Sequence, residues 1–435
     1  MGYIMKFKRD FYLDQLIDKK HNRKVKIITG IRRCGKSYLL FKLFYEHLLS
    51  NQVQKDQIIT LSLEGVDFLE YRNPLKLNEY IKSFITDQTK QYYVMIDEIQ
   101  YCETIKNPYL KNSSYDVTFV DVLLSLVKKE NVDVYVTGSN SKMLSTDVLT
   151  QFRGRGDEIH LNPLSFSEIY DSYSDKQQAF KDYSYFGGMP EVFNLKTEEE
   201  KKVYLTNLFN EIYIKDIVER NNILNQNQVL DILLDFISSS IGSLTNPTKL
   251  MNRFLSENKI NISSNTIKTY LDYFEESFII NSSKRYDVKG SRYYKTPLKY
   301  YFSDIGLRNA RINFRQNEQN HIQENIIYNE LKKRGYSVDV GVVVYDDKSL
   351  DKRKEVRLEV DFVVNQVDQR YYIQSALNID SYEKREQEIA SLKKINDSFK
   401  KIVIVGNDIY PRYDDSGILY ISIEQFLLDE NIINR

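Results

Sequence analysis

The sequence of 435 residues is poor in cysteine, histidine, glycine and proline, and it contains no tryptophan. Its two cysteines, Cys34 and Cys102, are too few for a disulfide framework, and the four scattered histidines give no zinc-ligand spacing. No run approaches the roughly 18 apolar residues of a membrane span, and no apolar stretch near the start predicts a signal peptide. We therefore expect a cytoplasmic protein with no membrane partner.

An excess of charge of one sign is also absent. Lys and Arg together number 61, and so do Asp and Glu, so the formal net charge is zero. Dedicated nucleic-acid binders are usually basic, so any contact with DNA must be local in this chain. Hydrophobic residues make up 42% and charged residues 28%, which is typical of a globular protein. The length exceeds that of a single core and predicts several domains.

Apolar strands alternate with helix-length segments in the first part of the chain. The short runs that we expect to be strands are 25–29, 57–62, 92–96 and 132–137. This alternation predicts an α/β fold with a parallel sheet and covering helices. The middle of the chain is mainly helical, and the last part returns to mixed α/β. There we expect a helix near 322–334 and strands at 338–344, 359–364, 371–373 and 402–405.

The segment after the first predicted strand carries a phosphate-binding motif. Residues 30–37 read Gly-Ile-Arg-Arg-Cys-Gly-Lys-Ser and match G-x-x-x-x-G-K-S without a mismatch. The glycines allow a tight turn whose amides point at phosphate oxygens, and the next helix adds the positive potential of its N-terminus. We expect Lys36 to reach the β- and γ-phosphates of ATP and the Ser37 hydroxyl to bind Mg²⁺. The alternative is a plain glycine turn with a solvated lysine.

The residues expected to contact the nucleotide are those of the loop and the start of the helix. They are Gly30, Ile31, Arg32, Arg33, Cys34, Gly35, Lys36, Ser37 and Tyr38. We expect Arg32 and Arg33 to point outward and to act electrostatically. Cys34 could make the site sensitive to oxidation, but an inert buried thiol is the favoured interpretation.

An acidic motif follows the third predicted strand. Asp97 comes at the carboxyl end of a buried strand, where α/β sheets bind ligands. We expect Asp97 to hold the magnesium shell and Glu98 to polarise the attacking water. A hydrolytic P-loop enzyme needs both carboxylates, because the metal offsets charge while a separate base orients the nucleophile. The alternative is that the two acids only cap the next helix.

Two later segments could act on a γ-phosphate. Residues 137–140 read Thr-Gly-Ser-Asn after the fourth predicted strand, which makes Ser139 and Asn140 candidate sensors, with a plain loop as the alternative. Arg153 and Arg155 could present a guanidinium to the charge that develops on phosphate. Because this segment is distant in sequence from the loop, Arg155 could act on a neighbouring subunit and would then require a homo-oligomer. A surface salt bridge is the alternative.

These motifs continue in a fixed order along the chain. After the phosphate loop come Met-Ile-Asp-Glu-Ile-Gln (95–100), Val-Thr-Gly-Ser (136–139), Gly-Arg (154–155), Pro-Leu-Ser-Phe-Ser-Glu (163–168), Gly-Gly-Met-Pro (187–190) and Tyr-Ile-Lys-Asp-Ile (213–217). With this series the sequence resembles the large family of bacterial and archaeal AAA-superfamily ATPases that carry a C-terminal domain of unknown function. The resemblance covers nearly the whole chain.

The resemblance implies a RecA-like P-loop core with an additional strand, a winged-helix middle and a restriction-endonuclease-like end. The positions that match the family are Gly30, Gly35, Lys36 and Ser37 in the loop, Asp97 and Glu98 in the acidic motif, Ser139 as sensor and Arg155 in the Gly-Arg pair. We expect a P-loop ATPase domain, a helical connector, a winged-helix-like domain and a degenerate nuclease-like α/β domain, over residues 1–165, 166–225, 226–312 and 313–435.

The last domain departs from an active nuclease. Restriction-type nucleases use a helix glutamate, a strand aspartate and Glu-x-Lys on the next strand, where the acids bind magnesium and the lysine positions water. Glu324 and Asp361 fit the first two positions, but Gln374 and Ala376 replace the acid and the lysine. An amide binds a hard metal weakly, and alanine cannot position water. We therefore expect Glu324 and Asp361 to be structural or to hold a metal only weakly.

The third domain has the pattern of a winged helix that could bind DNA. Capped helical segments near 245–250 and 264–268 precede a predicted hairpin. Its basic residues are Lys284, Arg285, Lys289, Arg292 and Lys295, and Tyr286, Tyr293 and Tyr294 lie among them. Such a hairpin can contact phosphates, so DNA is a candidate partner. The alternative is a winged helix that packs against protein, which the zero net charge favours.

The sequence thus predicts an ATPase that uses Mg²⁺ and drives a conformational switch in its C-terminal domains. The expected catalytic residues are Lys36, Glu98, Ser139 and Arg155, and the expected metal-binding residues are Ser37 and Asp97. A regulatory module that holds ATP with negligible turnover, and binds DNA or a protein partner, is the main alternative. An ATP-linked nuclease is less favoured, because the nuclease lysine is missing.

Overall fold

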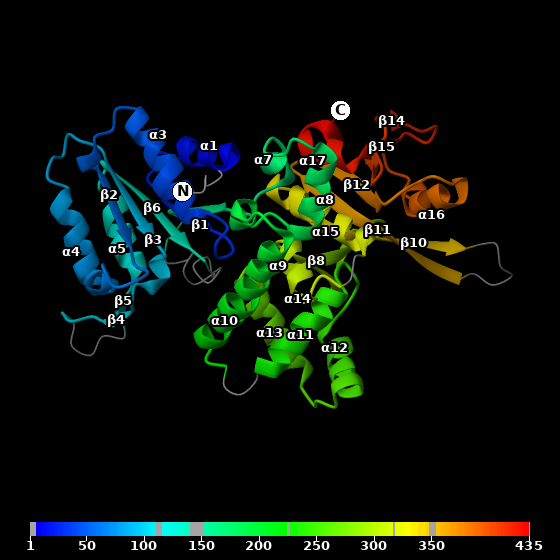
Figure 1. Cartoon of the computed structure of the whole chain (residues 1–435), viewed down its shortest axis with the longest axis horizontal. Coiled ribbons are helices and arrows are strands. Elements are labelled where there is room, and N and C mark those ends of the chain that lie inside the picture. The colour runs from blue at the N-terminus through cyan, green and yellow to red at the C-terminus, as the bar shows by residue number, and fades with distance from the viewer. Residues whose placement is uncertain are drawn as a thin grey trace. The chain divides into compact units, whose positions relative to one another are not determined.

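The computed structural model describes residues 6–109, 115–139, 152, 154–223, 227–315, 318–347 and 354–434. They form two compact units, each with its own sheet and covering helices (Figure 1). One unit consists of Met1–Pro163 with Glu276–Phe278, and the other of Leu164–Glu275 with Ile279–Arg435.

The first unit is built on a five-stranded parallel sheet. Its strands are β1 (Val25–Thr29), β2 (Ile58–Ser62), β3 (Tyr92–Asp97), β6 (Val132–Gly138) and β7 (Gly156–His160), in the order β2-β3-β6-β1-β7. The short strands β4 (Ile105–Lys106) and β5 (Asp116–Val117) pair separately. The helices are α1 (Asp10–Asp18), α2 (Lys36–Tyr38), α3 (Tyr45–Ser50), α4 (Pro74–Phe84) and α5 (Phe119–Val127), with a π-helical stretch Leu39–Phe44 joining α2 to α3.

This sheet confirms the α/β fold expected from the sequence. The four predicted strands are β1, β2, β3 and β6, and none of their ends differs from the prediction by more than one residue. β6 lies between β1 and β3, as the additional strand of the resemblance implies. The edge strand β7 is not among the predicted strands, because Gly-Asp-Glu-Ile-His contains a single apolar residue.

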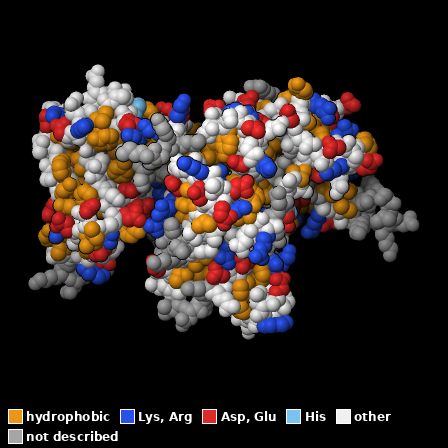
Figure 2. All heavy atoms as spheres, viewed as in Figure 1, with side chains coloured by type: hydrophobic (Ala, Val, Ile, Leu, Met, Phe, Trp, Pro, Cys, Tyr) orange, Lys and Arg blue, Asp and Glu red, His pale blue; other side chains and the backbone are white. Residues whose placement is uncertain are grey.

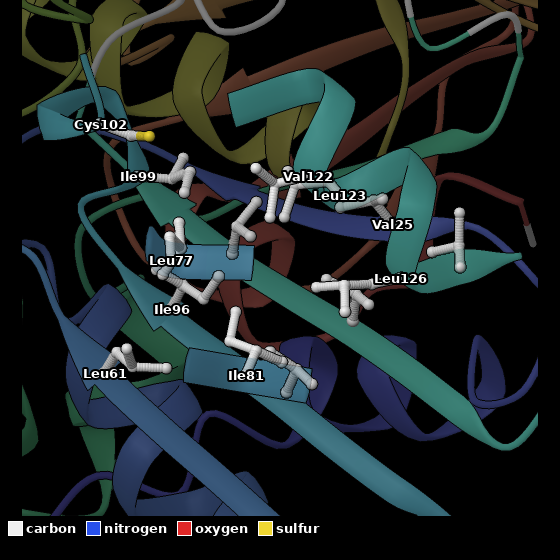
Figure 3. Close-up of a cluster of buried hydrophobic side chains, with 14 of the residues drawn as sticks. Val25, Leu61, Leu77, Ile81, Ile96, Ile99, Cys102, Val122, Leu123 and Leu126 are labelled. Carbon is white, nitrogen blue, oxygen red and sulfur yellow. The ribbon is translucent and has the colours of Figure 1, made fainter. Parts of the chain in front are cut away.

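Successive side chains along each strand point to opposite faces of the sheet, and both faces are buried. Figure 3 shows one of them, whose side chains include Val25, Leu61, Leu77, Ile81, Ile96, Leu123 and Leu126. These residues come from the strands, from α4 and from α5. On the other face Tyr135 of β6 packs on Phe44, with ring centroids 4.6 Å apart. Burial on both faces fixes the register of the strands, so the residues at their carboxyl ends lie together at one edge.

The second unit contains a mixed sheet with helices on both faces. Its strands are β8 (Ile280–Asp287), β9 (Arg292–Phe302), β10 (Ser337–Asp347), β11 (Lys354–Gln366), β12 (Gln369–Ala376), β13 (Lys400–Val405), β14 (Arg412–Tyr413) and β15 (Ile418–Ser422). The helices that follow the first unit in sequence are α7 (Phe166–Tyr170), α8 (Lys176–Phe186), α9 (Glu198–Asn207), α10 (Lys215–Arg220), α11 (Asn227–Ser239), α12 (Pro247–Arg253), α13 (Ser264–Glu276), α14 (Ile305–Arg311), α15 (Gln319–Lys333), α16 (Tyr382–Lys393) and α17 (Ile423–Leu428).

The sheet of the second unit crosses a boundary that the sequence led us to expect. Its strand order is β14-β15-β13-β12-β11-β10-β8-β9. Because β8 pairs in parallel with β10, the hairpin of β8 and β9 belongs to the same sheet as the strands of the last segment. The β8–β10 pairing therefore connects the expected segments 226–312 and 313–435 within one sheet.

The helices α15 and α16 cover opposite faces of this sheet. On the α16 face, Ile389 and Leu392 pack with Val363 and Tyr372 of the strands. On the α15 face, Tyr328 stacks on Tyr301 with ring centroids 4.2 Å apart. Apolar contacts on both sides bury β11 and β12, so a charged side chain on these strands needs a partner within the protein.

The Gly-Gly-Met-Pro segment that begins at Gly187 has a structural explanation. Gly187 has φ +71, and a Cβ there would lie 2.2 Å from Oδ1 of Asp304. A Cβ on Gly188 would lie 1.9 Å from the carbonyl oxygen of Leu164. The buried Asp304 carboxylate accepts hydrogen bonds from the amides of Gly188 at 2.6 Å and Leu307 at 3.0 Å. The glycines thus let the backbone close around Asp304, the N-cap residue of α14.

Candidate functional site

The predicted phosphate loop connects β1 to α2. Gly30 has φ +143, and a Cβ there would lie 2.2 Å from the carbonyl oxygen of Leu161. Gly35 immediately precedes α2 and has φ +103. Both positions require glycine, because other residues rarely adopt this conformation. The loop leads into the N-terminus of a helix, where the first amides have no partner within the helix and favour an anion.

Lys36 folds back over the loop. Its Nζ donates to the carbonyl oxygens of Gly30 at 3.0 Å and Ile31 at 3.2 Å, and the residue is only 4% exposed. These neutral acceptors can be exchanged for charged phosphate oxygens, which form stronger hydrogen bonds with an ammonium group. The position of Lys36 therefore fits the role expected for it.

Three oxygen-bearing side chains meet at the ends of α2, β3 and β6. The Ser37 hydroxyl donates to both carboxylate oxygens of Asp97, at 3.0 and 2.9 Å, and Thr137 donates to Oδ1 of Asp97 at 2.5 Å. Burial raises the pKa of Asp97, and the hydrogen bond from Thr137 partly opposes the shift. Hydroxyl and carboxylate oxygens are the ligands that Mg²⁺ prefers, so the residues present fit a magnesium ion.

Glu98 is held beside this group in a restricted conformation. Its backbone has φ 51 and ψ 51, which non-glycine residues rarely adopt, and its amide donates to the Thr137 hydroxyl at 3.0 Å. The Ser139 hydroxyl donates to Oε2 of Glu98 at 3.1 Å, and the side-chain amide of Gln100 donates to the same oxygen. Strain of this kind persists where the surroundings determine it, often at functional sites. The structure thus brings Glu98 and Ser139 together.

The other loop residues differ in exposure. Arg32 forms an ion pair with Glu64 at 2.7 Å, and Arg33 is exposed, so both point away from the loop interior. Cys34 is fully buried, its Sγ lies 3.4 Å from the carbonyl oxygen of Leu161, and burial raises the pKa of its thiol. A buried thiol with a raised pKa is unreactive, which supports the inert alternative. Tyr38 is partly buried in α2.

Arg155 lies far from the phosphate loop of its own chain. It directly precedes β7, and its carbonyl oxygen accepts a hydrogen bond from the amide of Val25 at the start of β1. The loop begins at the other end of β1, after a strand of five residues. At about 3.3 Å per residue this separation is roughly 16 Å, which excludes a contact between Arg155 and phosphates on the same chain.

Two candidate residues, Asn140 and Arg153, lie outside the described residues. Sequence reasoning missed two others, Thr137 and Gln100, although both lie in quoted motifs. Thr137 contacts both acids of the site, and Gln100 also approaches the Ser139 hydroxyl at 3.4 Å. The position of Thr137 at the carboxyl end of the strand next to β3 is the signal that could have identified it.

The acids of the nuclease-like segment come together in the second unit. Glu324 of α15 and Asp361 of β11 both face the ammonium group of Lys299, at 2.8 and 3.9 Å. Gln374 contacts Asp361 only through the backbone, because its Oε1 accepts from the Asp361 amide at 3.4 Å. Ala376 is buried and supplies no polar group. Lys299 was not predicted as a member of this group.

The basic residues of the β8–β9 hairpin are mostly at the surface. Lys284, Lys289, Arg292 and Lys295 are exposed, and the Arg292 Nε lies 3.2 Å from a carboxylate oxygen of Asp287. On the face drawn in Figure 2, Lys and Arg are interspersed with Asp and Glu over much of the surface. This mixture agrees with the zero net charge of the sequence. No helix among the described residues has the length and apolar character needed to cross a membrane.

Comparison with known proteins gives two family matches. A model described as an AAA domain matches residues 22–170, and one described as a domain of unknown function (DUF8612) matches residues 177–318. An uncharacterized protein of Haemophilus influenzae is 31% identical over 426 residues, which cover 97% of this chain and 98% of that protein. An uncharacterized protein of Methanocaldococcus jannaschii is 27% identical over 358 residues, covering 78% of this chain and 72% of that protein.

Solved structures with a distant likeness include an Orc1 protein and Cdc6p. The Orc1 protein of Aeropyrum pernix, in complex with DNA, has 11% identity and a TM-score of 0.27, covering 71% of this chain and 93% of that chain. Cdc6p from Pyrobaculum aerophilum has 12% identity and a TM-score of 0.28, covering 74% of this chain and 96% of that chain. At these low scores the likeness supports no conclusion about the present chain.

Proposed function

Because the chain belongs to the same family as the uncharacterized Haemophilus influenzae protein and its residues 22–170 match an AAA domain, we propose that it is a Mg²⁺-dependent ATPase. The observation that carries the proposal is the contact between the Ser37 hydroxyl and the Asp97 carboxylate, beside a lysine that is folded over a glycine loop. In P-loop enzymes these groups surround the metal and the phosphates of a bound nucleotide.

Ser37 and Asp97 would hold the metal, Ser37 directly and Asp97 through the surrounding water. A bound Mg²⁺ would supply positive charge that offsets the charge of the phosphates. Lys36 and the amides from Gly30 to Tyr38 would bind the phosphate oxygens. This division of roles agrees with the positions of the side chains at the carboxyl ends of β1 and β3.

Glu98 would orient and polarise the attacking water. Its carboxylate accepts hydrogen bonds from Ser139 and Gln100, which hold it beside the loop in one orientation. A carboxylate in this position can accept a proton from water within hydrogen-bond distance. Ser139 would respond to the γ-phosphate by changing its hydrogen bond to Glu98.

We further propose that turnover drives a conformational switch in the second unit. The phosphate loop packs on Leu161. The carbonyl oxygen of Leu161 lies 3.4 Å from the Cys34 thiol, and its backbone amide donates to the carbonyl oxygen of Thr29 at 2.8 Å. Three residues later Leu164 donates to the carbonyl oxygen of Gly188 at 2.7 Å, and Gly188 is bound by Asp304. A movement of the loop would therefore be transmitted to the second unit through the few residues from Leu161 to Leu164.

Arg155 would act on the phosphates bound by a neighbouring copy of the chain. It is exposed and lies at the edge of the sheet opposite to its own phosphate loop. A guanidinium supplied by a second subunit stabilises charge on the transferred phosphate in other P-loop enzymes. The proposal therefore includes a homo-oligomer as the active form.

The partner bound by the second unit would be DNA or a protein. A winged-helix arrangement is supported by an additional antiparallel pairing, in which Thr245 and Leu298 exchange two backbone hydrogen bonds of 2.9 Å. This pairing adds a third segment to the β8–β9 hairpin. The exposed Lys284, Lys289 and Lys295 would then contact phosphates, and such binding would weaken steeply with salt.

Two measurements on the pure protein test the ATPase proposal. Calorimetry with Mg-ATP measures binding, and phosphate release with and without DNA at several protein concentrations measures turnover. Binding with a near-zero rate that Glu98→Gln does not lower would favour the alternative, a regulatory module that holds ATP. Absence of binding at about 1 mM Mg-ATP, a free energy near −4 kcal/mol, would remove both.

A further inference from the structure

Four charged side chains converge in the second unit, in a place that the ATPase proposal does not use; Glu359, at 37% exposed, lies at the surface end of the group. Nζ of Lys299 lies 2.8 Å from Oε1 of Glu324, 2.7 Å from Oε1 of Glu359 and 3.9 Å from Oδ1 of Asp361. The Lys299 side chain is 4% exposed and that of Glu324 is 9% exposed. The lysine comes from β9, the glutamate from α15 and the other acids from β11.

Two acids in this group, Glu324 and Asp361, are the ones that a restriction-type nuclease would use for a metal. In such an enzyme Mg²⁺ lies among the carboxylates, and a lysine on the next strand positions water. Here the next strand is β12, which offers Gln374 and Ala376. The Ser375 amide instead donates to Oδ2 of Asp361 at 2.8 Å, so the protein already occupies one oxygen of this carboxylate.

The ammonium group of Lys299 lies between the carboxylates. It has three N–H donors, and two of the acids lie at hydrogen-bond distance from it. Tyr301 donates a further hydrogen bond, of 2.7 Å, to the same Glu324 oxygen. A divalent ion ligated by these oxygens would lie against the lysine ammonium in a buried site, where like charges repel strongly.

We infer that Lys299 is an internal cation that takes the place of a divalent metal in this carboxylate group, so that the second unit neither binds the metal of a nuclease nor cleaves nucleic acid here. The residues present thus do not fit the metal that the nuclease-like resemblance implies. In the part of the chain that the structure describes, no three His, Cys, Asp or Glu side chains form a group suited to a metal ion.

The protonation states in this group agree with the inference. Burial, aided by the charge of Glu324, raises the pKa of Asp361 to about 8. Burial also acts to raise the pKa of Glu324, but the Lys299 ammonium reverses this effect and lowers it. The two opposite shifts favour an ionised Glu324 beside Lys299 and the protonated form of Asp361. A protonated carboxyl group is a poor ligand for a hard metal ion.

Lys299 also connects parts of the chain that are distant in sequence. It belongs to the hairpin of β8 and β9, whereas its partners belong to the helix and strands of the last segment. The ion pairs therefore add to the β8–β10 pairing in holding the hairpin against the sheet. The group that would be catalytic in a nuclease acts here as a structural link.

Titration of Mn²⁺ into the full-length protein, followed by electron paramagnetic resonance, tests this inference. All variants carry Asp97→Asn, which weakens any metal site of the first unit. With Lys299 intact we expect no Mn²⁺ binding that depends on Asp361. In Lys299→Met we expect Mn²⁺ affinity to rise by about tenfold or more, and Asp361→Asn in the same chain to abolish the gain. Lys295→Met, on the same strand but exposed, should bind no additional Mn²⁺.

Two results would overturn the inference. One is Mn²⁺ binding by the protein with intact Lys299 that Asp361→Asn abolishes, and this result can be obtained even if Lys299→Met fails to fold. The other is a stable, folded Lys299→Met variant that gains no Mn²⁺ binding. Cleavage of DNA or RNA that depends on both a divalent metal and Asp361 would also overturn the inference.

A thermal melt distinguishes the internal cation from an ordinary surface lysine. Lys299→Met should lower the melting temperature, because it leaves Glu324 buried without its cation. Adding Glu324→Gln to the same chain should recover part of the loss, since the remaining side chain is then neutral. Independent, additive effects of the two substitutions would argue against the pair.

Discussion

The hydroxyl of Ser37 lies 3.0 and 2.9 Å from the two carboxylate oxygens of Asp97, although 60 positions separate these residues in the sequence. Parallel pairing in the sheet, with β6 between β1 and β3, brings the loop after β1 and the last residue of β3 to the same edge. The contact therefore depends on the order of the strands as well as on the two motifs.

The contact predicts how nucleotide binding responds to metal. Mg²⁺ should strengthen ATP binding in the parent protein. In Asp97→Asn this gain in affinity should be smaller by about 10- to 100-fold, because the carboxylate that orients the metal-bound water is lost. Calorimetry with and without Mg²⁺ measures the difference. Asp56→Asn, an exposed residue of the same unit, is the control and should leave both affinities unchanged. Equal loss with and without metal would show that Asp97 acts only on the fold of the loop.

Glu98→Gln should separate binding from turnover. The amide keeps an oxygen that can accept from Ser139, so the loop should still bind Mg-ATP. It cannot take a proton from water, so phosphate release should fall by about 10²- to 10⁴-fold. Glu103→Gln, which changes an exposed glutamate nearby, should leave the rate unchanged. A Glu98→Gln variant with normal turnover would rule out this residue as the base.

Arg155→Ala should retain ATP binding but lose turnover by about 10³-fold, because the guanidinium that stabilises phosphate charge is removed. If Arg155 acts on a neighbouring copy, mixing Arg155→Ala with Glu98→Gln should restore part of the activity. A mixed oligomer then contains sites with an intact Glu98 from one subunit and an intact Arg155 from the next. Arg23→Ala, which removes another exposed arginine of this unit, is the control for the change in charge. No recovery in a demonstrated mixed oligomer would exclude the proposed role.

The raised pKa of Asp361 predicts a dependence of stability on pH. The folded state holds this proton up to about pH 8, whereas an unfolded aspartate releases it near pH 4. Between these values the folded state binds more protons, so this group makes the free energy of unfolding fall as pH rises. Asp361→Asn should remove that decline, as measured by hydrogen exchange in β11 and β12 from pH 5 to pH 8.

The matched control for this titration is Asp368→Asn, which changes an exposed aspartate between the same two strands. It should leave the pH dependence of exchange as in the parent protein. A parallel response of the parent and Asp361→Asn over the whole range would mean that Asp361 has an ordinary pKa.

Gly188→Ala should destabilise the second unit by about 2 kcal/mol or more, because the added Cβ would meet the carbonyl oxygen of Leu164 at 1.9 Å. Gly335→Ala is the matched control, since its positive φ of 81 is strained but no atom lies within 4 Å of the added carbon. It should cost only about 1 kcal/mol. Denaturant unfolding measures both, and equal losses would contradict the close packing of the Gly-Gly segment.

The strands and the helix around the candidate nucleotide site could be located from the sequence because the motifs are local. A glycine loop, its lysine and an acidic strand end each occupy a few consecutive residues, and the strands carrying them are rich in apolar residues and wholly buried. Thr137 was not predicted, because its role depends on which strand lies next to β3. No local pattern determines that order.

The second unit was harder to predict for the same physical reason. Lys299 looks like one more basic residue of a hairpin until β9 brings it against α15 and β11. Likewise, the pairing of β8 with β10 joins residues more than 50 positions apart, such as Arg285 and Val340. Long-range pairing of this kind leaves no trace in residue spacing, so no pattern in the sequence indicates that one sheet extends across residue 312.

The β8–β10 pairing also determines where the chain can be divided for experiments. A truncated fragment that begins at residue 313 would leave the backbone of Val340 and Val342 without hydrogen-bond partners, on an open strand flanked by valines. Such edges recruit strands from other molecules, so the fragment should aggregate. A fragment that starts before Ile280 retains the hairpin and should stay monodisperse.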